Sequence, residues 1–368
     1  MTRALTRVLG LSTLLLVATP MGGCQDDLPK ASQITRMRIL GAGLEVQGDA
    51  NRTTPKPGET ARMTWSMAYP DAQQDDSRLA SMFIVCAASA QFTGTPVCQE
   101  LLDIARGGDV SDIGDDLAGG KNAPDCVANP DRVYKVGPFT VVCVTKTPIV
   151  DVVVAKDATE RARLVQGIVC LNGAPRVDRN DPRGFSCLPD AGTSVAADDA
   201  SQVESIAAYG TVPIQHSDEE KNDNPSIAAA SFFFHDPPLP WNDTPAEVTE
   251  ILSDETCRDQ SEAKRVMHSE GQTELITLKY QPDARQQFDG EPEGLLFSGY
   301  TTYGELNHRF VSFPWNATEP FERTFEWEIG EAARAELVNK SKRVRFYFTL
   351  TDQRGGFAIA RRDLCVNR

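Results

Sequence analysis

Short segments in which apolar and polar residues alternate recur along most of the chain. Residues 34–40 and 61–71 alternate in this way, and residues 82–86 form a continuous apolar run. Successive side chains of a strand point to opposite faces, so a period of two predicts a half-buried β-strand, and a continuous run predicts a strand buried on both faces. Further strands are expected at residues 137–144, 149–154, 162–171, 206–214, 227–234, 275–280, 294–301, 308–313 and 325–329.

The end of the chain has the clearest hairpin pattern. Alternation runs through residues 344–350, the Gln-Arg-Gly-Gly sequence at 353–356 is typical of a turn, and residues 357–359 return. Other segments interrupt the strands. We expect short helices at residues 99–106 and 332–339, and loops at residues 107–131 and 172–186.

The first two strands are separated by a turn whose residues explain it. Residues 54–59 read Thr-Pro-Lys-Pro-Gly-Glu, in which proline fixes φ and glycine adopts conformations that other residues avoid. The next strand ends in Pro70-Asp71. This order resembles the opening of an immunoglobulin-like or fibronectin-III-like β-sandwich, and the final hairpin resembles the last strands of the same class. The resemblance implies a mainly β fold with two immunoglobulin-like β-sandwich domains in tandem and short helices in the loops.

An acidic segment at residues 217–225 predicts the boundary between these domains. The first domain is expected at residues 34–216, with long disulfide-pinned loops, and the second at residues 226–368. The chain has 368 residues, which is enough for two domains that each bury a core.

The first 23 residues resemble the signal peptide of a bacterial lipoprotein. Arg3 and Arg7 make the start positive, and residues 8–18 are apolar but too short to span a bilayer. The Met-Gly-Gly-Cys sequence at 21–24 resembles a lipobox. The alternative is an ordinary secretory signal that is cleaved elsewhere.

The lipobox resemblance implies cleavage after residue 23, a diacylglyceryl group on Cys24 and acylation of the new amine, for example by palmitate. Two or three acyl chains anchor a protein stably in a membrane. Residues 24–33 would form the lipid-anchored tether, and Gln25 implies the outer membrane rather than the inner one. We therefore expect a cell-envelope protein that is periplasmic or surface-exposed.

The charge of the chain narrows the choice of partners. The net charge is −15, and removing the signal with Arg3 and Arg7 makes it about −17. Such a chain is repelled by nucleic acid and by anionic lipid headgroups, so we expect no nucleic-acid partner. The lipid on Cys24 is then the expected contact with the membrane, and no cofactor is expected.

The cysteines indicate an oxidising compartment. Nine are present, and setting Cys24 aside leaves an even number, which is typical of disulfides in an exported protein. Six precede the acidic segment and two follow it, so Cys257 pairs with Cys365 if no disulfide crosses that segment. The first six allow fifteen pairings, among which Cys170 with Cys187 is the preferred local pair. The eight are Cys86, Cys98, Cys126, Cys143, Cys170, Cys187, Cys257 and Cys365.

Two sets of residues are candidates for binding. Glu219, Asn222 and Asp223 carry the hard oxygen ligands that Ca²⁺ prefers, and the Asn-Asp-Asn sequence before Pro225 resembles the linker motif of cadherin repeats. A solvated acidic linker is the simpler alternative. Trp241 and Trp315 lie in Pro- and Asn-containing segments, where an exposed indole ring could contact a protein or stack on a sugar.

No sequence motif supports catalysis strongly. Ser261 and Lys264 have the spacing of the serine–lysine pair of penicillin-binding enzymes, but the partner motifs of that family are absent, and the four histidines lack metal-ligand spacing. We therefore expect a non-catalytic envelope lipoprotein that binds a protein or polysaccharide, with the second domain, farther from the anchor, as the expected contact. A lipid-anchored hydrolase without a recognisable motif is the alternative.

Overall fold

Nearly all of the regular structure is β-strand. The computed structural model describes residues 31–70, 78–88, 98, 124, 126, 129, 131–136, 139–178, 185–189, 203–234, 239–241, 265–267, 273–281, 285–288, 290–314, 316, 319–330, 341–352 and 354–367. All of them belong to one compact unit, Ala31–Arg368. The predicted signal with Cys24, both predicted helices, Cys257, Ser261, Lys264 and Trp315 lie outside the described residues.

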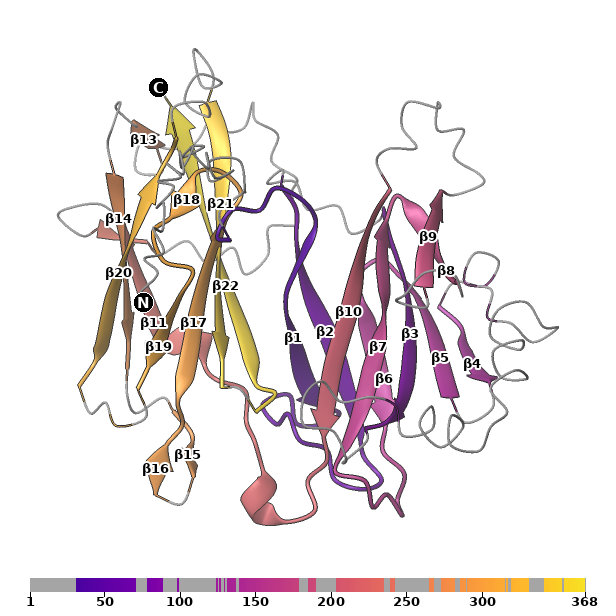
Figure 1. Cartoon of the computed structure of the whole chain (residues 1–368). Helices are drawn as coiled ribbons and strands as arrows, with labels where there is room; N and C mark the ends of the chain where they lie inside the picture. The colour runs from indigo at the N-terminus through magenta and orange to yellow at the C-terminus, as the bar shows by residue number, and fades with distance from the viewer. Residues whose placement is uncertain are drawn as a thin grey trace, which may run out of the picture. The chain divides into compact units, whose positions relative to one another are not determined.

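Two sheets pack face to face to form what we term the first sandwich (Figure 1). Trp65 of one sheet stacks on Phe83 of the other, with ring centroids 4.4 Å apart. One sheet has the order β1 (Arg38–Val46), β2 (Thr60–Ala68) and β6 (Ile149–Val153). The other has the order β10 (Glu204–Pro213), β7 (Ala162–Leu171), β3 (Leu79–Ala87), β5 (Phe139–Thr145) and β4 (Val133–Val136).

The second face of the five-stranded sheet is also buried. Met82 and Ile84 of β3 belong to a separate apolar cluster with Phe139, Ile168 and Phe185. Strand β3 is therefore covered on both faces, which confirms the prediction made from the apolar run at residues 82–86.

A hairpin replaces the loop that was expected at residues 172–186. Strands β8 (Gly173–Val177) and β9 (Phe185–Pro189) pair antiparallel, and Ala174 and Phe185 are buried. The loop prediction is wrong, because the many polar residues of this segment gave no strand pattern although two short strands form there. The Cys170–Cys187 disulfide links β9 to β7.

Two five-stranded sheets form what we term the second sandwich. Their facing sides share one large aromatic core that includes Phe297, Phe325, Trp327 and Phe348. One sheet has the order β12 (Leu239–Pro240), β11 (Ala230–Phe234), β14 (Thr273–Tyr280), β20 (Phe321–Glu328) and β18 (Glu305–Leu306). The other has the order β13 (Arg265–Met267), β22 (Phe357–Asn367), β21 (Ser341–Thr351), β17 (Leu295–Thr301) and β19 (Phe310–Phe313).

The final hairpin is longer than predicted. Strands β21 and β22, yellow in Figure 1, pair from Ser341↔Asn367 to Thr351↔Phe357. A small hairpin, β15 (Gln287–Phe288) with β16 (Glu291–Pro292), precedes β17. The sandwich architecture of the predicted fold class is confirmed, whereas the division into domains at residues 217–225 stays a prediction.

The helical content of the described residues is small. Two 3₁₀ turns, η3 (Asp218–Glu220) and η4 (Ile227–Ala229), lie between β10 and β11. The strand that was predicted from residue 227 therefore begins only at Ala230. Neither of these two turns is long or apolar enough to cross a membrane.

The first described residues lie along the second sandwich. The Ile34 N–H donates to the Thr301 carbonyl (2.8 Å), and the Thr301 N–H donates to the Ser32 carbonyl (2.9 Å). Ile34 is buried with Tyr300 and Tyr347, so β1 starts at Arg38 rather than at residue 34. Residues 32 and 34 therefore lie beside β17 of the second sandwich, whereas the expected distance of the second domain from the anchor stays a prediction, since Cys24 lies outside the described residues.

Candidate functional site around Asn222 and Asp352

The turn between β21 and β22 is built on a buried carboxylate. Oδ1 of Asp352 accepts the N–H groups of Arg354 (2.7 Å) and Gly356 (2.8 Å), and the side chain is only 4% exposed. Gly355 has a φ of 109°, a conformation that residues with a Cβ rarely adopt. The Asp and Gly positions of this turn are therefore fixed by hydrogen bonding and by backbone geometry.

Asn222 connects this turn to the first sandwich. Its Nδ2 donates to Oδ2 of Asp352 (2.6 Å) and to Oγ1 of Thr53 (3.0 Å). Its backbone N–H donates to Oγ1 of Thr54 (3.0 Å), and the Thr53 N–H donates to the Asn222 carbonyl (2.8 Å). Asn222 is 1% exposed, so the expectation of a solvated linker is wrong at this residue.

The residues that flank Asn222 extend the same network. Oδ1 of Asn224 accepts the Phe357 N–H (3.1 Å), and its Nδ2 donates to the Leu44 carbonyl (2.7 Å). The Asp223 N–H donates to Oε1 of Gln286 (2.8 Å). We call Asn222, Asp223, Asn224 and Asp352 the junction network, since its bonds join β1, the 51–54 loop, the final turn and the segment before β15.

The junction network engages atoms of two of the three calcium candidates, Asn222 and Asp223. Asn222 presents its amide nitrogen, not its oxygen, to Asp352, and Oδ2 of Asp223 pairs with Nζ of Lys221 (3.1 Å). The side chain of Glu219 lies outside the described residues. Within the described part of the chain, no group of three or more His, Cys, Asp or Glu side chains could hold a metal ion. Calcium binding by Glu219, Asn222 and Asp223 stays a prediction.

A buried glutamate lies beside this network. Glu293 is 6% exposed, and its Oε1 accepts the Gln286 N–H (3.0 Å), while Oε2 has no hydrogen-bond partner among the described residues. Burial raises the pKa of Glu293 to about 7, and the negative charge of Asp352 acts in the same direction. The N–H of Gln286 and the positive charges of Arg354 and Arg285 oppose the shift without cancelling it.

The same burial shifts the pKa values of Tyr280 and Arg285, which lie near Glu293. Burial raises the pKa of Tyr280 to about 12, and the charge of Glu293 contributes. Arg285 lies over the ring of Phe313 at 4.3 Å and donates from Nη1 to the Pro314 carbonyl (2.9 Å). Glu293 is therefore the group in this cluster that titrates near neutral pH.

An apolar pocket of about 450 Å³ lies between the turn that joins β21 to β22 and strands β1, β2 and β10. The ring of Phe357 rests on the backbone of Gly41, where any Cβ would collide with it. The wall is mainly apolar or glycine, and Arg354 adds a positive charge; it consists of Gly41, Ala42, Leu44, Met63, Gly210, Thr211, Pro213, Thr351, Arg354, Gly355, Gly356 and Phe357. A volume of this size is typical of small-ligand or side-chain pockets.

A second set of buried charges stabilises the final hairpin. Asp363 of β22 accepts hydrogen bonds from Arg343 and from Arg345, whose Nε lies 2.9 Å from Oδ1. Burial by itself would raise the pKa of Asp363, but the hydrogen bonds and charges of the two arginines outweigh it, and the pKa is lowered. This carboxylate is therefore ionised and fully engaged between two strands.

Trp241 does not form the exposed contact that was predicted. It is 7% exposed and packs edge-on against Phe234 and Phe346, each with a centroid distance of 5.3 Å. Its carbonyl accepts Nε of Arg362 (3.1 Å). The prediction of an exposed Trp241 is wrong, because its ring is part of the aromatic core of the second sandwich. Trp315, the other candidate, lies outside the described residues.

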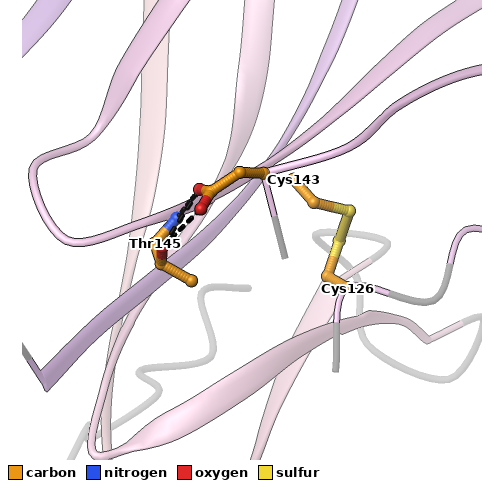
Figure 2. Close-up of a disulfide and its surroundings, with 4 residues drawn as sticks. Cys126, Cys143 and Thr145 are labelled. Carbon is orange, nitrogen blue, oxygen red and sulfur yellow. Dashed lines mark hydrogen bonds between the residues drawn. A yellow bond between two sulfur atoms is a disulfide. The ribbon is translucent and has the colours of Figure 1, made fainter. Parts of the chain in front are cut away.

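Three disulfides join neighbouring segments of the first sandwich. They are Cys86–Cys98, Cys126–Cys143 and the expected local pair Cys170–Cys187. Figure 2 shows the Cys126–Cys143 bridge next to Thr145, whose N–H donates to Oδ1 of Asp131 (2.7 Å). Cys257 lies outside the described residues, so its pairing with Cys365 stays a prediction.

Comparisons with known proteins give little information. No family model matches the chain, and no curated protein matches it. Escherichia coli alpha-2-macroglobulin activated by porcine elastase is similar at 8% identity and a TM-score of 0.20, over 91% of this chain and 22% of that one. The N-terminal domain of the Streptococcus gordonii adhesin Sgo0707 is similar at 7% identity and a TM-score of 0.23, over 84% of this chain and 60% of that one. The chain spans less than two thirds of both structures, and similarity this low carries no argument about function.

The junction network yields a prediction that can be tested by exchanging two side chains. Asp352→Asn would place an NH₂ donor opposite the Nδ2 donor of Asn222, so that both donors lose their partner. An unpaired buried donor costs about 1–3 kcal/mol. We expect the free energy of unfolding, measured with urea, to fall by about 2 kcal/mol. Adding Asn222→Asp restores a donor opposite an acceptor and should recover most of the loss. Equal stability of the single and double variants would contradict the assigned roles.

Glu293 predicts the direction in which stability changes with pH. Its folded-state pKa of about 7 exceeds its usual value of 4.5, so the folded state retains a proton that the unfolded chain loses. The stabilising contribution of Glu293 is therefore complete below pH 4.5 and is lost as the pH rises through 7, which amounts to about 3 kcal/mol from this group. Glu293→Gln should remove this component, so that the variant gains stability relative to wild type between pH 5 and 8. Parallel melting-temperature profiles for the two proteins would refute the assignment.

Proposed function

We propose that this protein is an extracytoplasmic lipoprotein, held in the cell envelope through Cys24, that binds an envelope protein or polysaccharide without catalysing a reaction. The observation that carries the proposal is the set of three disulfides in a β-sandwich chain. Such bonds persist in oxidising compartments outside the cytoplasm, which agrees with a start of the chain that resembles a lipoprotein signal.

The buried charged groups support a binding role. The carboxylate of Asp352 accepts hydrogen bonds from two backbone N–H groups and from Asn222, and that of Asp363 is held by two arginines. Both acids therefore position backbone and strands, and their lone pairs are occupied by these contacts. Acids used in this way favour a rigid binding scaffold over a set of reactive groups.

The apolar pocket beside Phe357 is the proposed contact, in place of Trp241. Leu44, Met63 and Phe357 provide apolar wall, and the exposed Arg354 adds a positive charge. Apolar pockets with a few polar groups are the usual places where a partner inserts an anchoring group. A protruding apolar side chain or an apolar substituent of a glycan fits this description.

The anchor and the compartment are tested by one mass measurement. We expect protein from native membranes to begin at Cys24, to carry a diacylglyceryl mass there, and to show no free thiols at the other eight cysteines. The Cys24→Ala variant should lack the added mass. An unmodified protein, or several reactive thiols among the eight, would contradict the proposal.

The binding role is tested by photo-crosslinking. A photoreactive residue at Thr211, which lines the pocket, should capture one envelope protein, whereas the same residue at the exposed Val153 should not. A polysaccharide partner would instead give binding to isolated envelope polysaccharide that is lost in Thr211→Trp. Crosslinks of equal pattern at both sites, without polysaccharide binding, would contradict a role for the pocket.

A further inference from the structure

Three arginines gather where the described chain begins. The guanidinium groups of Arg38 and Arg309 both lie over the ring of Tyr300, at 5.9 and 5.7 Å from its centroid. Burial lowers the pKa of Arg38, and the positive charges of Arg309 and Arg36 lower it further, although Tyr300 opposes this. We call Arg36, Arg38 and Arg309 the basic patch, in which Arg38 is close enough to each of the other two for the positive charges to repel.

The basic patch contrasts with the other arginines of this acidic chain. Arg52 pairs with Glu59, Arg62 with Asp151, and Arg345 with Asp363. Within the described ranges, none of the three patch arginines has a carboxylate within ion-pair distance, whereas the net charge is −15. The Glu204 carboxylate accepts the Met37 N–H at Oε2 (2.8 Å), and no ion pair joins it to a patch arginine among the described residues. A cluster of positive charges without acidic partners, in a chain that is negatively charged overall, is suited to binding an anionic surface.

An exposed aromatic ring adjoins the basic patch. Phe310 is the first residue of the edge strand β19, directly after Arg309, and its side chain is 60% exposed. An exposed phenylalanine beside cationic side chains is the combination with which interfacial proteins enter the headgroup region of a bilayer. Phe310 therefore adds an apolar contact to the electrostatic one.

The first described residues lie next to the basic patch. Nη1 of Arg38 donates to the Ala31 carbonyl (2.6 Å), and residues 32–34 are hydrogen-bonded to Thr301 of β17. Ala31 lies seven residues after Cys24, which is about 25 Å of fully extended chain. A lipid on Cys24 would therefore hold the basic patch within reach of the membrane surface.

We propose that the basic patch and Phe310 form the surface that lies against anionic lipid headgroups once Cys24 is anchored, which orients the protein on its membrane. This inference rests on the proposed lipid anchor. Each arginine near an anionic surface improves binding roughly fivefold, which is weak for a free protein but sufficient for one that the tether already concentrates there. The acidic remainder is repelled by the same surface, so attraction and repulsion favour the same orientation.

The test is hydroxyl-radical footprinting of the native lipidated protein in vesicles. In phosphatidylglycerol–phosphatidylethanolamine vesicles, oxidation of Phe310 should be at least threefold lower than in phosphatidylcholine vesicles. The exposed Tyr209 of β10 serves as the internal control and should be oxidised equally in both. High salt should restore the oxidation of Phe310, because it screens exposed charges.

Two charge reversals separate the basic patch from net charge. Arg309→Glu should restore the oxidation of Phe310 in phosphatidylglycerol vesicles, whereas Arg323→Glu, an equal charge change at an exposed site of β20, should not. Vesicle-bound protein with Phe310 equally oxidised in both lipids would overturn the orientation proposal alone. Protein that neither carries lipid on Cys24 nor floats with vesicles would overturn the anchor, and the orientation proposal with it.

Discussion

The hydrogen bond between the Asn222 amide and the Asp352 carboxylate is the contact on which the arrangement around residues 217–225 depends. Both groups are buried, so each would carry a desolvation cost without the other. The carboxylate shapes the turn between β21 and β22, and the amide continues to Thr53 beside the first sandwich. One pair of side chains thus specifies a turn, the path of a connecting segment and a contact between strands far apart in sequence.

Packing around this pair follows from the same constraint. The turn between β21 and β22 positions Phe357 so that its ring packs on Gly41, where only a glycine leaves room for the ring. This contact forms one wall of the apolar pocket, and Asn224 holds the Phe357 backbone from the other side. Burial raises the pKa of Glu293, and the charges of Asp352 and Arg354 in the turn act on it in opposite directions, so the titration of this acid depends on the same local arrangement. Pocket, turn and titrating acid are therefore parts of one arrangement.

Local periodicity was sufficient to predict most of the strands. Residues 162–171 coincide with β7, and the alternation at residues 344–350 lies within β21, because half-buried strands display their burial in the sequence. Sequence reasoning failed where distant contacts decide the outcome. The 172–186 segment reads as polar but pairs as a hairpin, and Trp241 has the surroundings of a loop residue but completes a core.

The candidate site was the least predictable part. Acidic and amide residues at 217–225 are typical of a solvated linker, and their composition does not reveal the buried carboxylate 130 residues later that pairs with Asn222. The Asp352 turn carried the one local signal, since an aspartate ahead of two glycines commonly accepts backbone N–H groups. Glu293 had no signal, because a raised pKa depends on burial that only the fold creates.

The junction network should make the two sandwiches unfold as one cooperative structure. Differential scanning calorimetry of the intact protein can show whether they do. We expect a single transition in which the calorimetric and van't Hoff enthalpies agree. Two separate transitions, each unaffected by replacement of Asn222, would instead show that the sandwiches unfold independently and that the junction network does not couple them.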